Sequence, residues 1–100
     1  MATTSKVLAR TAAATSSTTL YTVPASTTTI VTNIIIANTA SSSATATITL
    51  DGIAIVSGIT IAANSSTFLD LKQTLATTKI IAGLASATTV NFHISGVEIV

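Results

Sequence analysis

The sequence predicts an all-β protein: a single antiparallel β-sandwich, of jelly-roll or immunoglobulin-like type, with seven or eight short strands. Apolar residues recur at every second position along most of the chain, which is the period of a strand with one buried face. Turn-forming residues separate these stretches at short intervals. Thirty-four residues are Ser or Thr and only 7% are charged, whereas about 25% is usual, so hydroxyls fill the outward positions.

One hundred residues without cysteine make one domain with no disulfide. A domain this small buries only about 60–65% of its unfolded surface, so we expect oligomerisation to stabilise it. The net charge of +1 does not indicate a nucleic-acid or membrane partner. The N-terminus has no apolar segment of the kind found in secretory signals, so we expect assembly in a cytoplasm.

Residues 1–17 are low in complexity, and we expect them to form an N-terminal arm in front of a sandwich domain at residues 18–100. The arm residues expected to touch another subunit are Lys6, Val7, Leu8 and Arg10. An arm of this kind can add a strand to a neighbour through main-chain hydrogen bonds.

The first strand of the predicted sandwich, Leu20–Val23, ends at Pro24, because proline cannot donate to a β-ladder. The next, Thr28–Asn38, is apolar on both faces and should therefore be central or covered on both sides. Its alternation places Ile30, Ile34 and Ile36 on one face and Val31, Ile35 and Ala37 on the other.

The clearest alternation is in Ala44–Leu50, where Ala and Leu or Ile positions form one face and three threonines form the other. Asp51-Gly52 predicts a tight hairpin turn, since both residue types accept positive φ. The following strand, Ile53–Ile61, should place Ile53, Ile55, Ile59 and Ile61 on one face. Gly58 suggests a bulge or a close backbone approach in it.

Three further strands are expected at Thr67–Leu71, Lys79–Ala85 and Thr89–Val100. Between the first two, the spacing of Leu71 and Leu75 is compatible with one helical turn. In the last strand the apolar phase slips after Ile94, which predicts a β-bulge at Ser95-Gly96.

Residues able to carry chemistry are few, so we expect no catalytic residue, no bound metal and no cofactor. His93 is interpreted as a strand-surface histidine, with a ring of histidines around a symmetry axis as the alternative. Asp51 is explained by its turn and Asp70 by a strand end beside Lys72. Of the three aromatic residues, Phe68 and Phe92 are expected in the core and Tyr21 at its rim.

Four segments carry a family likeness: Leu20-Tyr-Thr-Val-Pro24, the strand Thr27–Asn38, Ile61–Leu71 and the closing Val90-Asn-Phe-His-Ile-Ser-Gly-Val-Glu-Ile99. Together they resemble small all-β structural proteins of tailed bacteriophages. The resemblance implies a virion protein made in the host cytoplasm, above all a capsid decoration (cement) protein. It also implies binding to the major capsid protein or another virion protein, and a homo-oligomer, with a trimer favoured.

Other functions stay open at this stage. A tail, neck or fibre subunit fits the same resemblance, and Thr- and Ile-rich strands with few edge charges also suit a self-assembling fibre or surface-layer protein. A receptor- or glycan-binding module is less favoured, because such sites use aromatic platforms, and an enzyme is not expected. We expect other subunits to touch the hydroxyl-bearing sheet faces, which cost little to desolvate.

Overall fold

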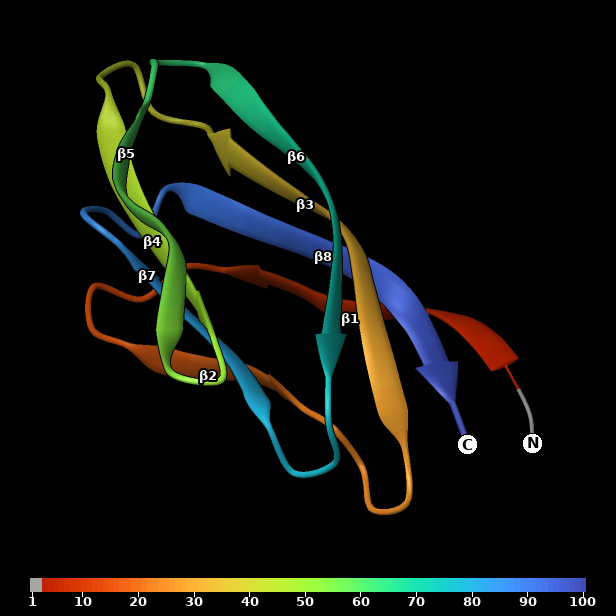
Figure 1. Cartoon of the computed structure of the whole chain (residues 1–100). Helices are drawn as coiled ribbons and strands as arrows, with labels where there is room; N and C mark the ends of the chain where they lie inside the picture. Colours follow the sequence, from red (N-terminus) through yellow and green to blue (C-terminus); the bar gives the residue numbers. More distant parts are fainter. Residues whose placement is uncertain (1–2) are drawn as a thin grey trace.

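The computed structural model describes residues 3–100, which form eight antiparallel strands in two facing four-stranded sheets (Figure 1). Within that range there is no helix. The strands are β1 (Thr3–Ala12), β2 (Thr18–Thr22), β3 (Thr28–Asn38), β4 (Ala44–Leu50), β5 (Ile53–Ile61), β6 (Ser65–Leu75), β7 (Ile80–Ala85) and β8 (Val90–Ile99). The predicted all-β sandwich is confirmed.

The strand order identifies the sandwich as a jelly roll. One sheet has the order β1-β8-β3-β6 and the other has the order β2-β7-β4-β5. Each strand of the first half of the chain pairs with its mirror strand in the second half: β1 with β8, β2 with β7, β3 with β6 and β4 with β5. The chain is thus one long hairpin rolled into two layers, the arrangement of eight-stranded jelly rolls.

The reversal of this hairpin is the Asp51-Gly52 turn between β4 and β5. Both residues have positive φ, 55° and 77°, as a two-residue type I′ turn requires. The Asp51 N–H donates to the Ile80 carbonyl (2.9 Å), and its carboxylate lies 3.6 Å from the Lys79 ammonium. The turn predicted from the sequence is confirmed.

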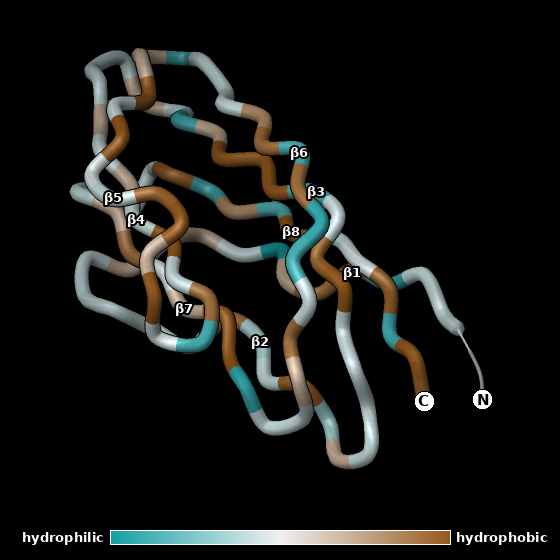
Figure 2. The backbone as a smooth tube through the Cα atoms, viewed as in Figure 1, coloured by the Kyte–Doolittle hydropathy of each residue, from teal (hydrophilic) through white to brown (hydrophobic). Residues whose placement is uncertain are grey.

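The core lies between the two sheets and is made of β-branched and aromatic side chains on alternate positions. Figure 2 shows apolar stretches along the strands and hydrophilic residues only in short stretches. Phe92 is fully buried, and a Cβ at Gly83 in the opposite sheet would approach its ring to 3.2 Å. The core also holds, with no exposed surface, the side chains of Val31, Ile34, Ile36, Ile48, Ile81, Val90 and Ile94. The inward positions predicted for β4 are all buried.

Residues expected to form a separate arm are instead part of the sandwich, which corrects the division at residue 17. Strand β1 pairs with β8 from Thr3↔Ile99 to Ala12↔Asn91 (Figure 1). Leu8, Ala9 and Ala13 are buried in the core cluster. Strand β1 thus covers an edge of β8 that would otherwise present an unpaired ladder. Residues 1 and 2 lie outside the described part.

The predicted bulge at Ser95-Gly96 is wrong, because the bulge does not lie in β8: buried and half-buried positions alternate without a break from Val90 to Gly96. The extra residues sit opposite, in the two neighbours of β8: Leu8 in β1 and Thr32 in β3. Because of the extra residue in β3, Ile30 and Val31 exchange the faces that simple alternation predicts, and Val31 is buried. Gly96 permits the close approach, because a Cβ there would lie 2.3 Å from the Ile30 carbonyl oxygen.

Two bulges interrupt β5, one of them at Gly58, whose φ is +62°, as the sequence suggested. The single apolar face predicted for this strand is therefore wrong: Ile53 is 71% exposed and Ile55 37%, while Val56 and Ile59 pack against the core. The helical turn considered after Asp70 is also absent. Pairing with β3 keeps β6 extended as far as Leu75.

A pair of neighbouring substitutions tests whether β1 belongs to the fold. We expect Leu8→Ala to lower the free energy of unfolding by about 2–5 kcal/mol, because it removes buried methyl groups. Val7→Ala, at a side chain that is 45% exposed, should change it by no more than about 0.5 kcal/mol. Urea unfolding followed by circular dichroism measures both. Equally small changes in the free energy of unfolding for both variants would indicate that residues 1–17 form a separate arm.

Candidate interaction surface

The two outer sheet faces differ in chemistry. The outer face of β2-β7-β4-β5 carries rows of threonines from three strands around a central strand, β7, whose outward residues are apolar. We call it the hydroxyl face and define it by Thr19, Thr22, Thr45, Thr47, Thr49 and Thr60, placed by the strand registers. Several of these hydroxyls are used within the chain: Thr49 Oγ1 donates to the Ala82 carbonyl (3.4 Å), and Thr47 Oγ1 accepts from the Gly58 N–H (2.9 Å).

The outer face of β1-β8-β3-β6 is richer in large apolar side chains. These residues alternate with buried ones and are half-buried or exposed, so they point away from the core. We call this surface the apolar face and define it by Val7, Ile30, Ile35, Phe68, Val97 and Ile99. Contacts with other subunits were expected at hydroxyl-bearing faces, whereas the exposed apolar surface lies on the other sheet.

Phe68 shows why the sequence missed this face. It was expected in the core but is 70% exposed, because Leu69 takes the inward position next to it in β6. Phe68 pairs in register with Ile35, which lies between the fully buried Ile34 and Ile36. Only the pairing of β6 with β3 decides which of two adjacent apolar residues faces out.

Strand register arranges the apolar face in rows that cross the sheet. One row runs Arg10–His93–Ile35–Phe68 from β1 to β6. The next row runs Val7–Ser95–Asn33–Asp70. The face therefore carries a cation at the β1 edge and a carboxylate at the β6 edge. Between them lie His93 and Ile35 in the first row and Ser95 and Asn33 in the second.

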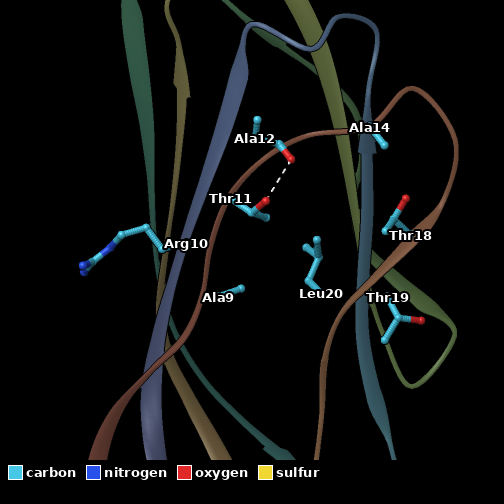
Figure 3. Close-up of a pocket in the computed structure, with 8 residues that line it drawn as sticks. All are labelled: Ala9, Arg10, Thr11, Ala12, Ala14, Thr18, Thr19 and Leu20. Carbon is cyan, nitrogen blue, oxygen red and sulfur yellow. Dashed lines mark hydrogen bonds between the residues drawn. The ribbon is translucent and has the colours of Figure 1, made fainter.

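The four residues predicted to touch another subunit fall into different environments. Val7 and Arg10 are exposed on the apolar face, and Arg10 points away from the adjacent cleft (Figure 3). Lys6 lies 3.4 Å from the Glu98 carboxylate, and Leu8 faces the core. Val7 and Arg10 are thus the two that are exposed on the apolar face, whereas Lys6 is exposed beside Glu98.

A polar cluster joins the two sheets at the end of the sandwich near Glu98. The Tyr21 hydroxyl of β2 donates to Glu98 of β8 and lies 2.8 Å from the hydroxyl of the fully buried Thr29. Burial, followed by the bond to Glu98, raises the pKa of Tyr21 to about 12. The Tyr21 hydrogen bond, aided by Lys6, holds the pKa of Glu98 below its ordinary value. The predicted placement of Tyr21 at the rim with its hydroxyl bonded is confirmed.

The remaining candidates do not come together as a site. A cleft of about 240 Å³ lies between β1 and β2, and the only hydrogen bond drawn between its lining residues is from Thr11 Oγ1 to the Ala12 carbonyl, 3.3 Å (Figure 3). Asp51 lies in the turn between β4 and β5 of one sheet, and Asp70 lies in β6 of the other. Residues 3–100 contain no group of three or more His, Cys, Asp or Glu side chains suited to a metal ion. None of these residues lies in a helix that could cross a membrane.

No protein-family model matches the chain. No curated protein sequence matches it either. The likeness to phage structural proteins therefore rests on the four segments quoted from the sequence.

The polar cluster predicts how stability depends on pH. A carboxyl whose pKa is lowered by folding stabilises the fold above its ordinary value of 4.5, and this stability is lost as pH falls through the folded pKa. Tyr21 acts at alkaline pH. Its raised pKa stabilises the fold fully below pH 10.0, and this stability is lost as the pH rises to about 12. Thermal unfolding across pH should show both losses.

Glu98→Gln should flatten the acid limb of this profile, and Tyr21→Phe should flatten the alkaline limb. Asp51→Asn is the control for the first variant. The Asp51 carboxylate is exposed and pairs with the half-exposed Lys79, so its removal should leave the acid limb nearly unchanged. An acid limb that is the same in Glu98→Gln as in the parent chain would contradict the assigned role of Glu98.

Proposed function

We propose that this chain is a structural protein of a bacteriophage virion that decorates the capsid shell, associating with copies of itself and with the major capsid protein. The observation that carries the proposal is a low-charge jelly roll with an apolar outer sheet face. Jelly rolls occur in viral capsid and lectin domains and in cupins, so the fold is one that virion proteins use. The sequence resemblance supplies the phage assignment.

The apolar face supports assembly because such a surface is costly to leave in water. Single exposed apolar residues are common, but contiguous apolar patches rimmed by polar groups mark interaction sites. Here Ile30 lies beside Val97 and Ile35 lies beside Phe68, and the polar Asn33–Ser95 row separates these two apolar pairs. Only 7% of the chain is charged, so few ionic groups would need desolvation when neighbours cover it.

Bulges in the edge strands favour a closed assembly over the alternative of an open fibre. Strand β5 is an edge of its sheet and carries two bulges, which disturb the ladder that another chain would extend. Strand β1 also carries a bulge, at Leu8. Both strands are thus protected against edge-to-edge pairing, although the sequence has few charges to do so.

The test is the composition of virions of the phage that carries this gene. We expect mass spectrometry of purified particles to find the chain in many copies, and antibody-labelled particles in electron micrographs to show it on the head. Label confined to the tail would move the proposal to a tail or neck subunit. Absence of the chain from purified particles, with the major capsid protein present as a control, would refute a virion role.

A further inference from the structure

We propose that the apolar face docks against the same face of a second copy of this chain, across a two-fold axis that runs parallel to the strands between β8 and β3. This inference deepens the self-association in the proposed function and rests on it. It names the surface, the occupant and the residue pairs, none of which follows from the fold alone.

The chemistry of the face fits the centre and rim of a protein interface. Its middle, on β3 and β8, pairs Ile30 with Val97 and Ile35 with His93, and the polar pair Asn33–Ser95 lies between them. Its charged groups, Arg10 and Asp70, lie on the edge strands β1 and β6. Interfaces place apolar residues at the centre and charged residues towards the rim. Phe68, 70% exposed, would bury the largest side chain of the set.

The order of groups across the sheet favours a second copy. A two-fold axis parallel to the strands keeps each row opposite the same row of the other copy and exchanges the edges, so that β1 faces β6. In such an interface, contact of residue i with residue j implies contact of j with i. Arg10 then lies over Phe68 of the second copy, and His93 lies over Ile35 of the second copy.

Charge complementarity follows from the same operation. Asp70 is two residues from Phe68 in β6, or about 6.6 Å along the strand, so Arg10 of one copy is near both groups of the other. Arginine can stack on the aromatic ring and pair with the carboxylate. The cation at one edge and the anion at the other are what a self-complementary face requires, and each pairing occurs twice in the dimer.

Sheet packing provides the geometry for this contact. Two sheets pack face to face at about 10 Å with strand directions within about 30° of each other, which preserves the approximate opposition of rows. The product is a four-layered dimer with the hydroxyl faces outside. A dimer would replace the homotrimer expected from the sequence as the form of the free protein.

A charge exchange tests the pairing directly. The mass of the purified full chain is measured by sedimentation equilibrium over a wide range of concentrations, and a monomer–dimer equilibrium is expected. Arg10→Glu and Asp70→Arg should each raise the dissociation constant by about tenfold or more, because like charges then meet. The double variant restores opposite charges and should return the dissociation constant close to that of the parent chain.

A second pair of variants tests the apolar centre. Ile35→Lys places a charge in the middle of the contact and should raise the dissociation constant by at least about 100-fold, because the charge would be buried unpaired. Leu84→Lys is the matched control, since Leu84 is half-buried on the outer face of β7 in the other sheet. It should leave the dimer unchanged. Circular dichroism and urea unfolding of every variant confirm that the sandwich is folded.

Each remaining outcome overturns the inference in a distinguishable way. A parent chain that is monomeric at every concentration refutes both this contact and self-association of the free protein, while the virion test above still decides the virion role. A trimer or larger oligomer whose mass is unaffected by Ile35→Lys refutes the contact alone. Folded, monomeric chains whose incorporation into virions is abolished by Ile35→Lys would assign the face to another virion protein.

Discussion

The architecture depends on one chain reversal, at Asp51-Gly52 in the middle of the sequence. Because every strand before it pairs with its mirror strand after it, the register set at this turn extends through β3 and β6 to β1 and β8. The outermost pairing joins Thr3 to Ile99, so most of the ladder links residues far apart in the chain. Such non-local pairing makes folding slow relative to helical proteins of the same length, because the chain loses the entropy of loop closure before the stabilising contacts form.

Bulges then decide which side chains the rolled hairpin displays. The extra residue at Thr32 turns Val31 into the core and Ile30 outward, and the alternation of β6 leaves Phe68 in solvent beside Ile35. Without the shift at Thr32, Val31 would take the place of Ile30 on the outer face of β1-β8-β3-β6. The surface proposed for self-association is thus a consequence of register rather than of composition.

The ends of the sandwich are held by polar groups that are all satisfied. Tyr21, Thr29 and Glu98 link the two sheets at one end. In the loop after β3, the Asn38 side-chain amide donates to the Ser42 carbonyl (2.8 Å) and the Ile61 carbonyl (3.2 Å) and accepts from the Ala40 N–H. Among residues 3–100 no buried side-chain polar atom lacks a partner. A chain with few charges thus obtains its polar links from hydroxyl and amide groups.

Local pattern by itself determined the class of fold, the Asp51-Gly52 turn and the dry face of β4, because alternation and turn chemistry act over a few residues. At Gly58 it indicated either a bulge or a close backbone approach, and the structure has a bulge there. Local pattern did not determine that residues 3–13 close the sandwich. This segment has few large apolar residues to show an alternating pattern, and its partner strand, β8, is at the other end of the chain. Local pattern also could not place Phe68 outside, because Phe68 and Leu69 are both apolar and only pairing with β3 selects between them. Tertiary structure decided these points, because a strand has two faces and the neighbour across the ladder chooses which one is buried.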